Sequence, residues 1–191
     1  MIRIPTVLAA ILIGTGAVAQ GVPDRATAAA ALFTAEGAQL QVLTQDFLSE
    51  ADIATLRAMP EVAQLDYYGA LAVPPDEGLR SSATRGAFNY HSPVAAQRAA
   101  LAGCRDARPD GADCAIVALI LPLGYEDGRA LTLSRSATAA VVARDFAQAG
   151  ADTVLAASAS SGAWGIGDGA QTAIAACAAD GATDCKIAVA D

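Results

Sequence analysis

The sequence predicts an α+β fold in which two tandem βαββαβ halves, at 39–121 and 122–191, pack together. The first observation is a repeat: GAFNYHSPVAAQRAALAGC at 86–104 and GAWGIGDGAQTAIAAC at 162–177 share Gly-Ala-aromatic, a helix-start signal and an alanine-rich run ending in cysteine. The second is that both runs continue through a Gly/Asp loop to Asp-Cys and an apolar segment. The third is that strand and helix periodicities succeed one another in the same order in each half.

The second half shows the order of its elements most clearly. Leu131 and Leu133 alternate with polar neighbours and predict a half-buried strand. Ser136 is then expected to cap a helix that Gly150 ends. The elements expected after that helix are strands over 153–159 and 163–166, a helix over 170–177 and a strand over 185–190.

The first half is expected to follow the same order, with Ser49 and Ser92 as helix caps and Pro93 at the first helical position. This order is that of the ferredoxin-like, split-βαβ fold. Two right-handed crossovers would place both helices on one sheet face, so that one half can cover the other. The run CAIVALIL at 114–121 is apolar on both faces and is therefore expected at the junction. A single mixed α+β sheet is the alternative.

The N-terminus has the layout of a secretory signal peptide. Arg3 precedes an apolar stretch over 4–16, and Ala-Val-Ala at 17–19 predicts cleavage before Gln20. A membrane anchor is the alternative, but the stretch is short for a hydrocarbon core of about 30 Å. Residues 20–38 are expected to form a lead-in with a helix. The sequence thus predicts a periplasmic or secreted protein, without membrane insertion after cleavage.

The charge of the chain limits its partners. After loss of the leader, eleven basic residues remain against twenty acidic ones, a formal charge of −9. Such a chain has no basic footprint for nucleic acid. The partners expected are an unknown protein or a cell-wall ligand, and the sequence does not predict the oligomeric state.

Four cysteines follow the leader, and an even number in an exported chain favours disulfides over metal or redox chemistry. The repeat selects the pairs Cys104–Cys114 and Cys177–Cys185. Each pair would join the second helix of its half to the strand that follows. Each closes a loop of about ten residues, which the chain-entropy model values at about 2.5–3 kcal/mol.

The glycines between 162 and 169 are similar to a nucleotide-binding loop, but we interpret them as structural. Asp168 would occupy the helix-cap position and place negative charge where a phosphate binds. The corresponding loop of the first half, Asn-Tyr-His-Ser at 89–92, contains no glycine. The glycines are therefore expected to shape a corner of the chain.

Candidate chemistry is sparse. His91 is the only histidine and is interpreted as a solvated loop residue rather than a general base. One histidine and paired cysteines predict no metal site. The acidic pairs at 76–77 and 126–127 lack the spacing of a calcium loop and are interpreted as solvated turns. The candidate ligand contacts lie in the two hairpins, although most of the aromatic ones are expected in the core: Tyr68, Phe88, Tyr90, His91 and Trp164.

The sequence lacks the residues that two enzyme classes require. No G-x-S-x-G nucleophile elbow occurs. A pyridoxal-phosphate enzyme of the aminolevulinate synthase type is disfavoured, because Lys186 is the only lysine and it follows a disulfide cysteine in a terminal strand. We expect no cofactor and no catalytic residue.

The motifs Tyr68-Gly69-Ala70-Leu71-Ala72, Gly86-Ala87-Phe88, an alanine-rich helix to Cys104 and Cys114-Ala115-Ile116-Val117 resemble an exported domain family of unknown function. Its members typically show YGAIA, a glycine-aromatic strand, A-x-x-x-A-x-x-x-C and C followed by VV. The second half fits from Gly162 to Cys185 but has Val154-Leu155-Ala156 in place of YGA. Gly86-Ala87-Phe88-Asn89 with Ser92 is also similar to the turn of SPOR domains, which bind peptidoglycan glycans. This second resemblance implies a cell-wall ligand.

The leading hypothesis is an exported, non-catalytic binding or structural domain whose ligand is a cell-wall glycan or a protein. Its support is a duplicated architecture without a catalytic constellation. The alternative is a small periplasmic enzyme that uses loop carboxylates with His91 in a cleft between the halves.

Overall fold

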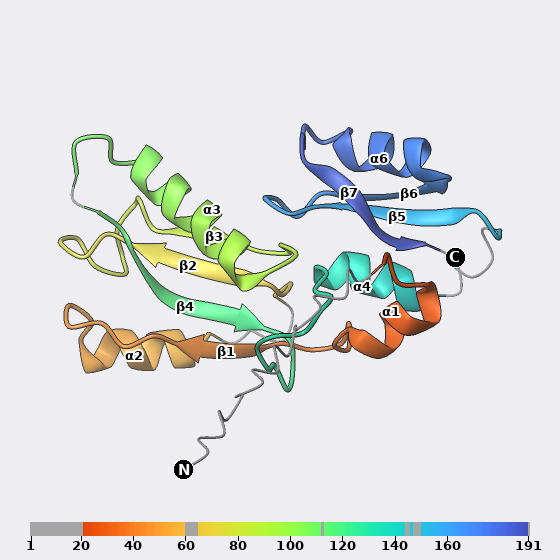
Figure 1. The fold of residues 1–191 in the computed structure, drawn as a ribbon. Helices are drawn as coiled ribbons and strands as arrows, with labels where there is room; N and C mark the ends of the chain where they lie inside the picture. The colour runs from red at the N-terminus through yellow and green to blue at the C-terminus, as the bar shows by residue number, and fades with distance from the viewer. Residues whose placement is uncertain (1–20, 60–64, 112, 144–145, 147–149, 191) are drawn as a thin grey trace, which may run out of the picture.

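The computed structural model describes residues 21–59, 65–111, 113–143, 146 and 150–190. The predicted signal peptide falls on residues 1–19, outside the described residues. The α+β class is confirmed, with two antiparallel sheets and helices packed against both (Figure 1). Because the strands divide into two sheets, the alternative of a single mixed sheet is wrong.

The first sheet has the order β1-β4-β2-β3 and the second has the order β6-β5-β7. All neighbouring strands within each sheet are antiparallel. The strands of the first sheet are β1 (Gln39–Val42), β2 (Gly69–Val73), β3 (Arg85–Ala87) and β4 (Ala115–Leu121). Those of the second are β5 (Thr153–Ser158), β6 (Trp164–Asp168) and β7 (Cys185–Ala190).

Three strands are arranged alike in the two halves. The set β4-β2-β3 has the same neighbours and directions as the set β7-β5-β6. The register also shifts at the same place, between Leu71 and Ala72 and between Leu155 and Ala156. In each half a helix, α3 (Pro93–Asp106) or α6 (Ala170–Ala178), connects the last two strands. The two halves thus share one strand–strand–helix–strand unit.

The prediction of a strand at 131–134 is wrong. The segment has the alternating sequence pattern of a strand, yet it pairs with no strand among the described residues. Leu133 instead packs into the core beneath β5 and β7, and Ser134 caps α4 (Arg135–Val142) by accepting a hydrogen bond from the Ala137 N–H. Ser136, the expected cap, lies within the helix. As far as the structure describes the chain, the second sheet therefore has no equivalent of β1.

The helices of each half cover opposite faces of its sheet, not one face as expected. In the first half, Ala70 and Ala72 pack toward α3, whereas Leu71 and Val73 pack toward α2 (Glu50–Arg57). In the second half, α6 covers one face, and α4 with α1 (Arg25–Ala31) covers the other (Figure 1). The run 114–121 is apolar because β4 is covered on both faces within its own half. It does not form the junction between the halves.

Helix α1 packs onto the second half, although the first half follows it in the sequence. Ala28 and Leu32 belong to the core of Leu133, Val141 and Val189. Hydrogen bonds from Arg129 to the carbonyls of Ala31 and Leu32 fix the end of the helix. The helix of the predicted lead-in therefore completes the core of the C-terminal half.

Two glycines of the 162–169 stretch allow α6 to lie directly on β6. A Cβ added at Gly165 would collide with the backbone N of Cys177, and one at Gly167 would collide with the backbone N of Ala173. Gly169 is the helix cap, with φ 80° and no side-chain hydrogen bond, so Asp168 ends β6 and does not cap the helix as predicted. The glycines have a structural role, in close packing rather than in a corner.

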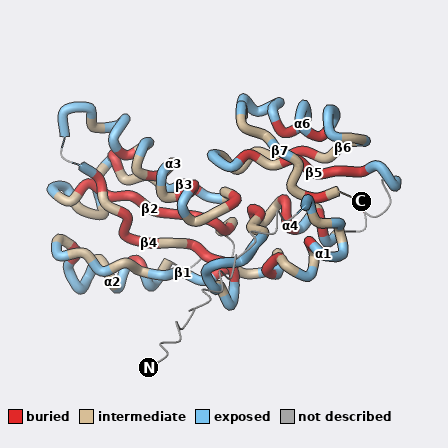
Figure 2. The backbone as a smooth tube through the Cα atoms, in the orientation of Figure 1, coloured by how far each residue is buried: buried red, intermediate tan, exposed pale blue. Residues whose placement is uncertain are grey.

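The inner strands β2, β4 and β5 are largely buried (Figure 2). In the part of the chain that the structure describes, no helix combines the length and apolar character needed to cross a bilayer.

Candidate functional site

The junction between the halves is built around His91. Its side chain is 5% exposed, so the prediction of a solvated loop histidine is wrong. The Ser134 N–H donates to Nδ1 at 2.9 Å, and Nε2 lies 3.0 Å from the Ala163 carbonyl. Because Nδ1 accepts a backbone hydrogen bond, the proton resides on Nε2, which donates to Ala163. The ring of one half is thus held by two backbone groups of the other.

This environment keeps His91 neutral. Burial lowers the pKa of the imidazole below its usual value of 6.5. Both ring nitrogens are occupied, so neither is free to take a proton from a substrate. The role of His91 in joining the halves was not predicted, because its two backbone partners lie 43 and 72 residues away and no nearby motif indicates them.

Asn89 makes a second link across the junction. Its side-chain amide donates to Ser136 Oγ at 2.8 Å, and the Ser136 N–H donates to Asn89 Oδ1 at 3.1 Å. Trp164 Nε1 donates to the same hydroxyl at 2.9 Å. Asn89 has φ 62°, a left-handed conformation that asparagine tolerates. Gly162 lies so close that a Cβ there would collide with the Asn89 carbonyl oxygen.

Arg135 makes a third link, from the first turn of α4. Its N–H donates to the Tyr67 carbonyl at 2.9 Å, and its guanidinium reaches Asp66 at 3.1 Å. The guanidinium also donates to the Ala35 carbonyl at 2.8 Å. Three consecutive residues, 134–136, therefore have their backbone N–H groups bonded to the first half.

A cavity of about 260 Å³ lies beside His91. Its walls come from the segment 131–133, from the end of β5 and from Lys186, Ile187 and Ala188 of β7. A second hollow of about 560 Å³ shares Leu131, Ile187 and Ala188 with it and extends to Gly21 and Pro23. We call these two hollows together the β7 groove. Its end beside His91 and Ser92 lies at the junction, and the rest is lined by the second half and by the segment that contains α1.

Ser158 lines the cavity but is not arranged as a nucleophile. Its hydroxyl donates to Asp184 Oδ1 at 2.5 Å, and the Ser160 N–H donates to Asp184 Oδ2 at 2.9 Å. The hydrogen bond from Ser158 is the main cause that lowers the pKa of Asp184. No relay from serine to histidine forms, because His91 is bonded to Ser134 and Ala163.

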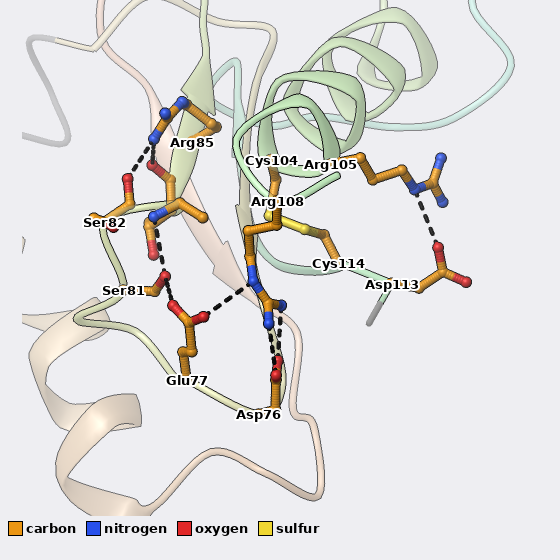
Figure 3. The surroundings of a disulfide bond; sticks show 12 residues. Asp76, Glu77, Ser81, Ser82, Arg85, Cys104, Arg105, Arg108, Asp113 and Cys114 are labelled. Atoms are coloured by element: carbon orange, nitrogen blue, oxygen red, sulfur yellow. Dashed lines mark hydrogen bonds and ion pairs between the residues drawn. A yellow bond between two sulfur atoms is a disulfide. The ribbon is translucent and has the colours of Figure 1, made fainter. Parts of the chain in front are cut away.

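Both predicted disulfides are present. The Cα atoms are 6.2 Å apart in Cys104–Cys114 and 6.1 Å apart in Cys177–Cys185. Figure 3 shows the first bridge at the end of α3, where Arg105 also forms an ion pair with Asp113 at 3.3 Å. Since these thiols are paired, they offer neither a nucleophile nor metal ligands.

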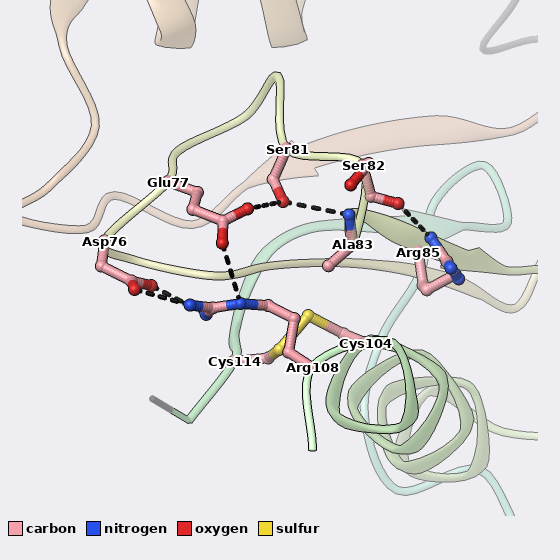
Figure 4. A network of polar contacts seen from close by, with 9 residues as sticks. All are labelled: Asp76, Glu77, Ser81, Ser82, Ala83, Arg85, Cys104, Arg108 and Cys114. Carbon is pink, nitrogen blue, oxygen red and sulfur yellow. Dashed lines mark hydrogen bonds and ion pairs between the residues drawn. A yellow bond between two sulfur atoms is a disulfide. The ribbon is translucent and has the colours of Figure 1, made fainter. Parts of the chain in front are cut away.

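The acidic pair at 76–77 lies in an exposed turn, as predicted, and its carboxylates also form one side of a clamp (Figure 4). Arg108 contacts Asp76 through two hydrogen bonds, of 2.8 and 2.6 Å, and its Nε lies 3.1 Å from Glu77. The hydrogen bond from Arg108 lowers the pKa of Asp76. Ser81 Oγ donates to Glu77 at 2.5 Å. The clamp ties the loop after β2 to the disulfide end of α3. The second acidic pair contributes Asp127, which accepts from the Tyr125 hydroxyl.

The five predicted ligand contacts do not share a surface. Tyr68 is buried among Tyr67 and Tyr125, with ring centroids 5.4 and 6.0 Å away, and burial raises the pKa of its phenol. Phe88 covers the glycines at 69 and 86 and keeps 36% of its surface exposed. Tyr90 packs beside α3. Tyr68 and Tyr90 pair through their backbones, whereas His91 and Trp164 each bond to the start of α4 at the junction. These five residues therefore do not assemble an aromatic platform.

Within the described ranges, no group of three or more acidic, cysteine or histidine side chains is arranged to hold a metal ion. Comparison with protein-family models, with curated proteins and with solved structures finds no match for this chain.

Proposed function

We propose that this chain is an exported, non-catalytic domain that binds a partner in the periplasm or outside the cell. The observation that carries the proposal is that both ring nitrogens of His91 form hydrogen bonds that hold the halves together. The histidine that the enzyme alternative would use as a general base is therefore committed to structure. Two disulfides and the layout of the N-terminus support export.

The binding surface in this proposal is the β7 groove. The groove is lined by apolar side chains of Leu131 and Ile187 with a lysine at one end, a composition typical of ligand sites that have few polar contacts. A cell-wall glycan is less well supported, because the candidate aromatic residues do not form a stacking surface. A protein or peptide ligand fits the groove better.

The test exposes the oxidised protein, purified after export, to a peptide array and, separately, to purified peptidoglycan in a sedimentation assay. We expect peptide binding that reduction of the disulfides abolishes, and no sedimentation above that of an unrelated acidic protein. Retention on peptidoglycan without peptide binding would show that the ligand is a cell-wall glycan and not a peptide.

The enzyme alternative is tested on chromogenic ester, peptide and glycoside substrates. We expect no turnover. Turnover that is lost in His91→Gln, but kept in Val141→Ala as a control with a similarly weakened core, would contradict the proposal.

A further inference from the structure

We propose that the outer edge of β7 accepts an extended segment of a partner protein as an added strand. This inference rests on the binding function proposed above and names its site and mode. β7 is an edge strand among the described residues, and Ala190 alone makes a backbone hydrogen bond on that edge, to the Pro23 carbonyl at 3.1 Å. An unpaired edge presents N–H and C=O groups to an incoming strand.

In the first half, β1 occupies the position that corresponds to the outer edge of β7. β1 pairs with β4 antiparallel, with Leu40 opposite Ile120 and Val42 opposite Ala118. Beyond β1, the Leu43 N–H donates to the Val117 carbonyl at 2.8 Å, and the Gln45 side chain donates to the Ile116 carbonyl at 3.0 Å. A strand of alternating polar and apolar residues thus completes the sheet.

No described residue pairs with the same positions on β7. Ala188 and Ile187 follow Cys185 at the same spacing as Val117 and Ile116 follow Cys114. The segment at 131–134, which the sequence aligns with 43–46, makes no hydrogen bond to β7 within the residues described. The groove lies between them instead.

The junction explains why the segment 131–134 does not pair with β7. The Ser134 N–H is bonded to His91, and the Arg135 N–H is bonded to the Tyr67 carbonyl. These bonds direct the end of the segment toward the first half. Leu133 is buried in the core, so the segment cannot slide onto β7 without uncovering it.

The chemistry of the groove defines the partner. Leu131, Ile187 and Ala188 provide apolar contacts for alternate side chains of an added strand. Lys186 is exposed at one end, and among the described residues no carboxylate is within ion-pair distance of its amine. An acidic side chain on the partner would therefore find an unpaired cation in an otherwise acidic protein. The expected occupant is an extended segment with apolar alternation and an acidic residue near Lys186.

The chain itself supplies a probe. A fluorescein-labelled peptide AQLQVLTQD copies residues 38–46, and the register of β1 on β4 would place its aspartate toward Lys186. Fluorescence anisotropy with the oxidised protein should show saturable binding. Lys186→Glu should weaken it about fivefold at low salt, whereas Arg98→Glu, a matched charge reversal on the exposed side of α3, should not.

Backbone pairing is tested by N-methylation of the peptide. A methyl group on the amide that copies Leu43 removes the donor used in the first half and should weaken binding at least about tenfold. The same modification on the neighbouring amide, which copies Val42 and points away from the paired strand, should have little effect.

Equal effects of the two methylations, or of the two charge reversals, would overturn strand addition. So would a dimer in sedimentation velocity, since β7 would then pair with a second copy. If the peptide array still yields ligands whose binding Lys186→Glu leaves unchanged, the site is wrong while the binding function stands. If no peptide binds at all, strand addition fails together with the proposed protein or peptide ligand, and the binding function itself fails if peptidoglycan does not retain the protein either.

Discussion

The two halves differ most at the outer edge of their corresponding strands. On β4 this edge is covered by β1, and the register is continuous from Gln39 to Val42. On β7, none of the residues that the structure describes pairs with this edge except at Ala190. The remaining unit of three strands, a helix and a disulfide is arranged alike. The comparison indicates that β1 completes the unit of the first half, whereas no strand among the described residues completes the unit of the second.

The halves also differ in how their second helix is held. In the second half α6 lies so close to β6 that glycine is required at two positions. In the first half Gly103 of α3 faces only the Arg85 side chain, at 3.5 Å from an added Cβ. A matched pair of glycine substitutions therefore separates close packing from helix propensity.

The largest effect is expected for Gly165→Ala. The added methyl group would collide with the backbone of α6, and overpacking of this kind should cost about 3 kcal/mol. Gly103→Ala should instead stabilise the protein by up to about 1 kcal/mol, because it removes a helical glycine and meets ordinary contacts. Urea unfolding measures both. Equal effects would show that α6 is not held by close approach to β6.

The next largest effect is expected when one disulfide at a time is removed. Each closed loop is short, so each bridge should contribute about 2.5 kcal/mol to the free energy of unfolding. We expect Cys177→Ala with Cys185→Ala to be the more damaging pair, because the first half keeps the Arg108 clamp at its bridge. A larger loss from Cys104→Ala with Cys114→Ala would show that the clamp does not compensate.

His91→Ala tests the junction. It leaves the Ser134 N–H and the Ala163 carbonyl without their buried partner, which should cost about 2 kcal/mol. Circular dichroism during urea titration measures the loss. An unchanged unfolding free energy would mean that the junction is held by Asn89 and Arg135 without the histidine.

The pH dependence of stability follows from the same residue. The folded pKa of His91 lies below the unfolded value of about 6.5, so its contribution is complete above that pH. The contribution is lost as the pH falls from about 6.5 toward the folded pKa. His91→Asn should flatten this part of the stability profile, and a slope that persists in the variant would assign it to other groups.

The smallest effect is expected for Arg108→Gln. This side chain pairs with exposed carboxylates, and exposed ion pairs contribute little to global stability. Limited proteolysis should nevertheless cut the loop at 74–84 faster. Unchanged cleavage would show that the loop is held without the clamp.

The sequence predicted what depends on local pattern. The Ser49 and Ser92 caps, the helix from Pro93 and both disulfide pairs follow from short motifs, and the structure confirms them. Prediction from the sequence failed where hydrogen bonds to distant backbone groups determine the conformation of a segment. Leu131 and Leu133 have the alternation of a strand, yet the contacts of Ser134 with His91 direct the segment elsewhere.

The candidate site was predicted only in part, for the same reason. His91 and Trp164 do lie at the junction, but the contacts of Asn89, Ser136 and Arg135 across it were not predicted. Tyr68 was misplaced as a ligand contact, because an aromatic residue beside a strand has the same sequence pattern in a core and on a surface. The opposite-face placement of the helices depends on tertiary packing that periodicity does not encode.

Amide hydrogen exchange on β4 and β7 tests the difference between the two halves most directly. We expect the outward-facing amides of β4 to be protected by β1 and those of β7 between Lys186 and Ala188 to exchange rapidly, then to gain protection when the peptide AQLQVLTQD is added. Equal protection of the two strands in the protein alone would contradict an open edge on β7.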